Sequence, residues 1–469
     1  MQIPFLKNKN TRRHTVLAVC LFVLAWLLFA HPDILETANH SYLFLENLFS
    51  GDILHFYENV MLHENTLYYI NNAHYNIVMY LIFGVFLLPV FIVNKLFALP
   101  VQEPLIYFIS KFVAIAFFFA SIYLLYRITL ILTEKEEDSL WVGLQTLLWP
   151  PAFFAVAIMG QYDSICLFFM LLGIYYWLKN RLTACSMWFG VAAACKFFPL
   201  ILFALLILLK EKAPLKVAKY ALLSLWVLIP TSLLFYGRTG DMSVFNGLMI
   251  DRVFAATFTG GVHISLFPAC MLFLCVFAYI YTPNDEKESH KMSIWMGLVV
   301  FGAIFILIDW HPQWILLLAP FIVLTTYMEE NRFLWSCLDI TLSLGFFLIC
   351  FIYYPGELEA NLAYQGLLGV ILKYNFFAVS EASNSISFYI MRLLPILMNL
   401  APVLFATPIF ANIVFKAPCK GKTFASTLVK SKEEVNFKPA VYLWLVFFTG
   451  IIFWALPVAF TWLKGFSFI

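Results

Sequence analysis

Residues able to do chemistry stand inside an otherwise apolar stretch, residues 149–199. Gln161 and Asp163 lie two positions apart, and Lys196 follows about thirty residues later. Ionisable side chains at membrane depth cost about 2.5 kcal/mol or more each, so they usually face a cavity or a partner. A carboxylate can accept a proton from a hydroxyl group, and a lysine can neutralise a phosphate. The pattern therefore predicts a polar site within an apolar bundle.

Each of these residues also has a purely structural interpretation. Gln161 and Asp163 would cap a helix that begins at Ser164, because a carboxylate is favourable near a helix N-terminus. Lys196 would lay its stem along apolar surface and hold its charge in the interface. The sequence leaves both interpretations open.

The elements that must position these residues follow from composition. Of the 469 residues, 63% are hydrophobic and 12% are charged, and the mean hydropathy is +0.87. A soluble chain would carry about 25% charged residues. We therefore expect an all-α polytopic membrane protein. The net charge of +2 gives no reason to expect a nucleic-acid partner, and the nine cysteines form no CxxC pair that would indicate zinc or a disulfide scaffold.

Apolar runs near bilayer length predict about 11 to 13 transmembrane helices in one domain covering 1–469. They lie at 15–30, 75–94, 105–130, 139–158, 163–178, 182–209, 217–236, 263–282, 292–308, 314–328, 333–353, 389–413 and 440–463. Three regions stand out within this domain: a first loop at 31–73, the polar-site region at 149–199, and a basic loop at 416–438.

The charges of the loops predict the orientation. Residues 31–73 contain no lysine or arginine, so this first loop is expected outside the cell, with two short amphipathic helices at 41–51 and 53–62. Basic loops at 127–135, 179–181, 210–219 and 416–438 are expected inside, as is the N-terminus. Gln161 and Asp163 then face outward. The compact loops favour a bacterial plasma membrane.

Two segments complicate this topology. Residues 75–130 must cross an odd number of times, and 182–209 has both ends inside. A re-entrant hairpin over 182–209 resolves the second difficulty, with Lys196 near its tip and Pro199 breaking the helix.

This topology gathers the polar residues on one face. They are the acidic first loop, Gln161, Asp163, Lys196, Arg238, Asp241, Asp251, Arg252, Asp309, His311 and Gln313. His311 is alternatively an interfacial residue beside Trp310 and Trp314, and Arg252 is alternatively a local partner of Asp251. The first-loop histidines show no HxH or HxxxH spacing, and the sequence leaves the need for a divalent metal open.

Several of these strings resemble one known family. GQYD at 160–163, KNR at 179–181 and FGVAAACKFFPLILFALLILL at 189–209 resemble the GT-C superfamily of multispan glycosyltransferases. The pattern is similar to the bacterial mannosyltransferase-like group related to GPI mannosyltransferases. The matching residues are Gly160, Gln161, Asp163, Gly190, Ala192, Lys196 and Pro199, then His311, Trp314, Leu316 and Pro320, and in the first loop Tyr42, Gly51 and Tyr57.

The resemblance implies a GT-C-like bundle that transfers a mannose-like hexose from a polyprenyl-phosphate donor to a lipid or cell-envelope glycan on the outer face. It implies no resident cofactor beyond that donor. Its implied roles fall into three sets. Asp163 with Asp33, Glu36 or His40 would handle the acceptor hydroxyl; Lys196, His311 and Arg252 would hold the donor phosphate; and Gln161, Tyr42, Tyr57 and Gln313 would contact substrate.

The chain departs from the family's pattern at one position. The family usually carries an aspartate a few residues before the first-loop tyrosine, whereas residues 37–41 before Tyr42 contain no carboxylate. Asp33 or Glu36 upstream, or His40, would have to replace it. Two other functions therefore remain open: a transporter or flippase of lipid-linked sugars, and an inactive partner in a glycan-assembly complex.

Overall fold

The computed structural model describes residues 9–62, 73, 75–101, 103–236, 252–259, 263–329, 332–354, 367, 395–419, 422–424 and 438–465. Arg238, Asp241, Asp251 and most of the loops at 355–387 and 416–438 lie outside the described residues.

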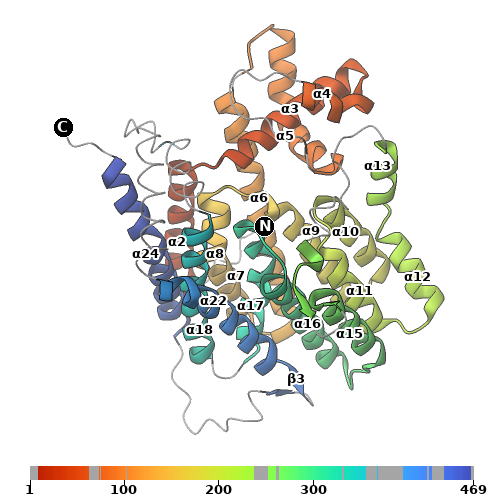
Figure 1. Ribbon diagram of the computed structural model, residues 1–469, viewed down its shortest axis with the longest axis vertical. Helices are drawn as coiled ribbons and strands as arrows, with labels where there is room; N and C mark the ends of the chain where they lie inside the picture. The colour runs from red at the N-terminus through yellow and green to blue at the C-terminus, as the bar shows by residue number, and fades with distance from the viewer. Residues whose placement is uncertain are drawn as a thin grey trace.

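Helices dominate these residues (Figure 1). The elements of the first half are α2 (Lys9–Leu28), α3 (Pro32–Ser50), η1 (Ile53–His55), α4 (Phe56–Leu62), α5 (Ile77–Leu96), α6 (Glu103–Thr133), α7 (Glu136–Leu148), α8 (Pro150–Phe153), the π-helical turn η2 (Phe154–Ile158), α9 (Asp163–Leu178), α10 (Leu182–Cys195), α11 (Pro199–Lys210), α12 (Pro214–Leu223) and α13 (Leu228–Leu234). Those of the second half are β1 (Thr257–Thr259), β2 (His263–Ser265), α15 (Leu266–Ile280), α16 (Glu286–Leu307), η3 (Pro312–Trp314), α17 (Ile315–Tyr327), α18 (Arg332–Tyr353), α22 (Pro395–Phe415), β3 (Pro418–Cys419), β4 (Lys422–Thr423) and α24 (Pro439–Gly465).

The described helices confirm a polytopic all-α membrane protein. Six are long and apolar enough to cross a bilayer, and up to eight spans result if each of two bent pairs is one span. Six further apolar helices have only 10–17 residues. Since a single crossing needs about 20 residues, the count of about 11 to 13 spans stays a prediction, as does the odd number of crossings over 75–130.

Prolines break two of the apolar runs. Pro150 and Pro151 follow an extended Trp149, and the chain bends there by 57°. Pro199 begins α11, and its ring would clash with the carbonyl of Cys195 if the helix ran on. The chain therefore leaves the helical conformation at Lys196, whose φ and ψ are −153° and 138°.

Residues 182–210 form the expected helical hairpin. Asp163, at the start of α9, pairs with Lys196 at the turn between α10 and α11. At the other end of α9, the Trp177 indole donates to the Leu206 carbonyl, 2.8 Å away, near the end of α11. Hence α10 runs toward the Asp163 end of α9 and α11 runs back, with Lys196 at the tip.

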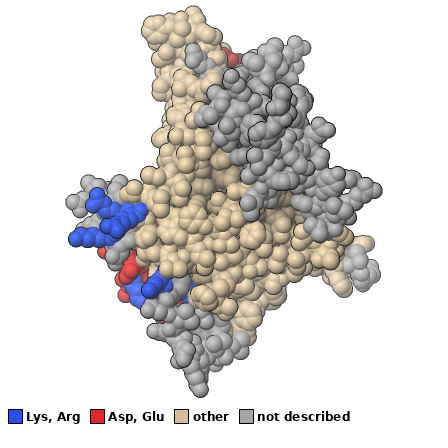
Figure 2. All heavy atoms as spheres, turned by 90° about the vertical axis from the view of Figure 1, so that its left-hand side faces the viewer, with Lys and Arg blue, Asp and Glu red and all other residues tan. Residues whose placement is uncertain are grey.

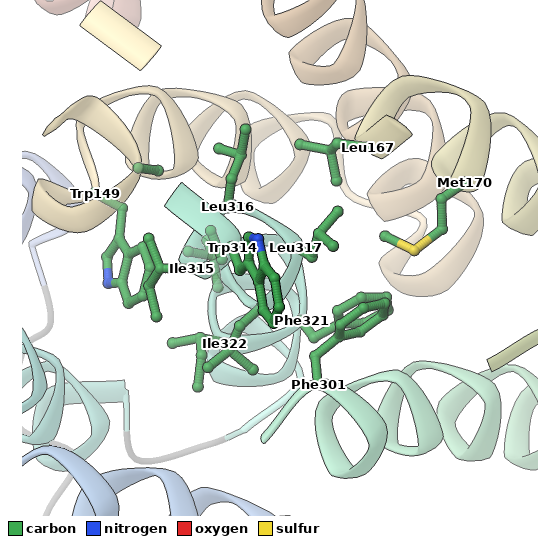
Figure 3. Close-up of a cluster of buried hydrophobic side chains, with 14 of the residues drawn as sticks. Trp149, Leu167, Met170, Phe301, Trp314, Ile315, Leu316, Leu317, Phe321 and Ile322 are labelled. Atoms are coloured by element: carbon green, nitrogen blue, oxygen red, sulfur yellow. The ribbon is translucent and has the colours of Figure 1, made fainter. Parts of the chain in front are cut away.

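Helix α17 lies in the middle of the bundle, and all thirteen of its residues are buried. Figure 3 shows Leu316, Leu317 and Phe321 reaching toward neighbouring helices, with Phe301 of α16 beside Phe321. The two rings stack 5.5 Å apart. Burial of this kind contributes about 1.5–3 kcal/mol per large side chain, so the N-terminal end of α17 is firmly placed.

The first loop forms its own small core. Helices α3, α4 and α5 lie together at the upper end of Figure 1, where buried residues such as Phe44, Phe56 and Tyr80 pack together. The two predicted loop helices are confirmed, although α3 begins at Pro32, earlier than expected. On the face in Figure 2, charged side chains gather mainly in the lower part, which agrees with a cytoplasmic lower end; the orientation itself stays a prediction.

Candidate functional site

The turn at 160–163 positions the first two candidate residues. The π-helical turn ends at Ile158, Gly160 follows with a φ of +73° that favours glycine, and the backbone N–H of Gln161 donates to the Ala155 carbonyl at 2.9 Å. Helix α9 then starts at Asp163 with Tyr162 as its N-cap and no side-chain cap. Neither side chain therefore caps the helix by a hydrogen bond, although Asp163 does lie in its first turn, where a carboxylate is favourable.

Lys196 meets Asp163 inside the bundle. Its ammonium forms an ion pair with Asp163 Oδ1, and the two side chains are 8% and 1% exposed. The lysine Nζ also lies 5.3 Å from the centroid of the Trp314 ring. The interpretation of Lys196 as an interfacial, solvated lysine is wrong, because its charge is held in the interior.

Two buried oxygens of this turn have no partner among the described residues. They are Asp163 Oδ2 and Gln161 Oε1, on side chains of residues that are 1% and 0% exposed. Buried polar atoms are nearly always hydrogen-bonded, and an orphan at a functional site indicates a missing water, ion or ligand. These two acceptors suit a hydroxyl or N–H donor.

Asp33 is the accessible carboxylate of the group. It lies in the first turn of α3, its side chain is 39% exposed, and the Gln161 Nε2 donates to its Oδ2 at 3.0 Å. The His31 Nδ1 lies 3.3 Å from its Oδ1. Desolvation raises the pKa of Asp33, but His31, Gln161 and His311 outweigh this effect and leave the pKa below its ordinary value. Asp33 is therefore ionised at neutral pH.

His311 completes the cluster from the second half of the chain. It precedes η3, at the N-terminal end of α17, and its ring lies 5.5 Å from that of Trp314. Partial desolvation and the positive charges of Arg252 and Lys196 lower its pKa to about 4, against the opposing effect of Asp33 and Asp309. The imidazole is thus neutral at pH 7. Trp314 links His311 to Lys196, because its ring lies 5.5 Å from the His311 ring and 5.3 Å from the Lys196 Nζ.

The remaining candidates have other surroundings. His40 is buried against the ring of Tyr80, and the Tyr42 hydroxyl accepts from Asn94 at 3.2 Å. The Tyr57 hydroxyl donates to the Tyr75 carbonyl at 2.9 Å. Glu36, one turn beyond Asp33, and Gln313, beside His311, are half-buried. Of the three candidate bases, Asp33 is the one with a hydrogen bond to Gln161.

Sequence reasoning missed four neighbours of the cluster: His31, Tyr75, Tyr162 and Lys111. The rings of Tyr75 and Tyr162 meet edge to face at 5.2 Å. Lys111 is the one of these four that a sequence signal could have found, because it is the only lysine in the apolar run 105–130 and lies far from the basic end at Arg127. Within the described residues, no group of three or more His, Cys, Asp or Glu side chains is arranged to hold a metal ion.

Comparison with known proteins adds little. Neither a model of a known protein family nor a curated protein matches this chain. The chain is similar to the crystal structure of ArnT from Cupriavidus metallidurans bound to undecaprenyl phosphate, with a TM-score of 0.42 and 14% identity over 85% of this chain and 75% of that one. For ArnT in the apo state the values are 0.41 and 14%, over 86% and 76%. A likeness this weak carries no functional argument, so the residues of the chain itself must supply one.

Proposed function

We propose that this protein is a GT-C-type glycosyltransferase that uses a polyprenyl-phosphate sugar as its donor. One observation carries the proposal: an ionised, accessible carboxylate, Asp33, accepts a hydrogen bond from the Gln161 side chain, and two residues further on Asp163 pairs with the ammonium of Lys196. This pairing of a base with a phosphate-binding charge lies at one end of a membrane bundle. A donor whose lipid tail stays in the bilayer can reach it there.

The chemistry is a displacement at the anomeric carbon of the sugar. Asp33 accepts the proton of the acceptor hydroxyl as that oxygen forms its bond to the carbon. The bond from the carbon to the phosphate oxygen breaks, and the electron pair leaves with the carrier phosphate. Lys196 and Arg252 stabilise the charge that develops on this leaving group.

Asp163 takes a different role from the one expected of it. Its Oδ1 is committed to Lys196, so it fixes the ammonium rather than accepting a proton from the acceptor. Its free Oδ2 and Gln161 Oε1 would accept hydrogen bonds from sugar hydroxyls. His311, neutral at pH 7, would donate one hydrogen bond to the phosphate.

The finer specificity follows the family resemblance. We propose a mannose-like hexose as the sugar and a lipid or cell-envelope glycan as the acceptor, on the outer face of the plasma membrane. These choices rest on the GQYD and CKFFP strings rather than on a sugar contact.

The test is a turnover assay of the purified protein in detergent with radiolabelled polyprenyl-phosphate mannose and glucose. Transfer or donor hydrolysis that is lost in Asp33→Asn, but kept in Glu36→Gln one turn along the same helix, would support the enzyme. Donor binding without turnover, lost in Lys196→Ala, would instead favour a transporter of lipid-linked sugars. No binding of either donor would favour a structural partner.

A further inference from the structure

Lys111 is a buried charge that the proposed chemistry does not use. It lies on α6, one of the candidate membrane spans, and is 2% exposed. No carboxylate within the described residues forms an ion pair with it. A charge held in such a place needs a compensating partner.

The partners of Lys111 are backbone carbonyls. Its Nζ donates to the oxygens of Trp26 and Phe29, where α2 ends at Leu28. The last carbonyls of a helix have no partner within the helix and carry partial negative charge, so a cation is favourable there. The ammonium thereby holds the segment that leads from α2 into His31 and Asp33.

The stem of the same side chain touches the other half of the site. Its Cγ, Cδ and Cε atoms lie 3.0, 3.3 and 3.0 Å from where a Cβ on Gly160 would stand. Gly160 immediately precedes Gln161. The methylenes of Lys111 therefore form the wall against which the 160–163 turn rests.

These two contacts place one side chain between the two segments that carry the reacting carboxylate and its orienting amide. We propose that Lys111 is a positioning residue: it fixes the 29–33 segment relative to the 160–163 turn, so that Gln161 meets Asp33 at 3.0 Å. The expected effect of Lys111 on turnover rests on the proposed function, whereas its placement of the 29–33 segment against the 160–163 turn does not. A misplacement of about 1 Å at a reacting group can cost about 100-fold in rate.

The competing explanation is that Lys111 only caps α2. Lys111→Met separates the two, since methionine keeps an unbranched stem of similar reach against Gly160 but cannot hold the carbonyls. Lys416→Met is the matched control. Lys416 is also 2% exposed, and it donates to the Thr325 and Thr326 hydroxyls at 3.2 and 2.8 Å. These threonines lie near the C-terminal end of α17, whereas His311 precedes its N-terminal end.

The first measurement is hydrogen exchange of the full-length protein in detergent. In Lys111→Met we expect faster exchange over both 29–33 and 160–165, whereas Lys416→Met should loosen 322–329 and leave both segments unchanged. Faster exchange at 24–30 alone, or a uniform increase over the whole chain, would overturn the proposal.

The second measurement is donor turnover by the same variants. Lys111→Met should lower kcat by about 10- to 100-fold while KM for the polyprenyl-phosphate sugar stays within about twofold, because the phosphate-binding residues are untouched. Wild-type kcat in Lys111→Met, corrected for the folded fraction, would also overturn the proposal. If the wild-type protein turns over no donor, the proposed function fails, and the exchange result alone decides the role of Lys111.

Discussion

Two ion pairs at different places in the bundle, one partly exposed and one buried, differ in how many of their polar atoms have hydrogen-bond partners. Between α7 and α18, the Arg332 guanidinium donates to both oxygens of Asp138, at 2.8 and 2.9 Å, and to the Tyr327 carbonyl at 3.2 Å. At the α10–α11 tip, Lys196 meets only one oxygen of Asp163, and the other oxygen has no partner among the described residues. The Arg332–Asp138 pair, here called the complete pair, is satisfied within the protein. Within the described residues, the Lys196–Asp163 pair, here called the open pair, leaves one carboxylate oxygen free to accept a hydrogen bond from another group.

We propose that this contrast distinguishes a structural charge pair from a functional one. A buried pair rarely adds net stability, because desolvation of both charges offsets their attraction. The bidentate geometry of Arg332 makes a well-satisfied clamp between two helices. The Asp163 pair is more deeply buried and less well bonded, so stability alone does not explain it. Under the proposed function, a hydroxyl group of the ligand would supply the missing donor.

The largest expected effect is the loss of sugar transfer when Asp33, near the open pair, is replaced. Asp33→Asn should lower transfer by about 10²–10⁴-fold, because the amide cannot accept the acceptor proton. Binding of the donor lipid should change little, since Asp33 does not hold its phosphate. Single-turnover transfer and donor binding, measured on the same preparation, check both parts. Transfer within tenfold of wild type would remove Asp33 as the base.

Removing the cation of the open pair should come next in size. Lys196→Ala should weaken donor binding and turnover by about 10²–10³-fold through the loss of phosphate stabilisation. It also leaves Asp163 buried without a counterion, so the folded fraction must be measured alongside. The double variant Lys196→Met with Asp163→Asn removes that unpaired charge. It should regain stability relative to Lys196→Ala and remain inactive. Activity in the double variant would contradict the phosphate role.

Disruption of the complete pair should lower stability and leave turnover unchanged. Arg332→Ala should destabilise the protein by about 2–3 kcal/mol, a value reduced for the partial exposure of both side chains. The molecules that remain folded should keep their kcat, because Arg332 takes no part in the proposed chemistry. Thermal unfolding in detergent and turnover per folded molecule test the two halves separately. A selective loss of kcat at unchanged stability would mean that the clamp also serves the site.

Much of this arrangement was visible in the sequence, and its limits have physical causes. Apolar runs and loop charges predicted nearly every helix and the hairpin with Lys196 at its tip, because both signals are local. The partner of Lys196 was not predictable, since pairing depends on how α9 and α10 pack. The choice among Asp33, Glu36 and His40 also needed the fold: on one helix these residues face different surroundings, and only Asp33 meets Gln161.

For Lys111 the residue itself carries a sequence signal, but its partners do not. A lone lysine in the apolar run 105–130 was a sequence signal for a functional or structural role. Its partners, however, are backbone carbonyls and a glycine, which carry no side-chain signature. No pattern of residue types would have linked it to Trp26, Phe29 and Gly160.

The smallest expected effect concerns pH and the neutral His311 beside the open pair. Its pKa is lowered to about 4 by partial desolvation and by Arg252 and Lys196, whereas an unfolded histidine titrates near about 6.5. Between these two values the unfolded chain binds the extra proton, so stability falls as the pH drops from about 6.5 to about 4 and is unaffected by His311 above that window. Allowing for partial exposure, the loss should be about 1–2 kcal/mol.

Thermal unfolding at pH 7.5 and pH 5, with His311→Gln as the matched variant, measures this difference. The variant should lose much less stability than the wild type on acidification. A bound donor phosphate should reduce the wild-type loss, because its negative charge opposes the effect of Arg252 and Lys196 and lets His311 accept a proton within the folded state. If donor lipid leaves the acid sensitivity unchanged while it binds, the phosphate does not lie beside His311, and the open pair must serve another part of the ligand.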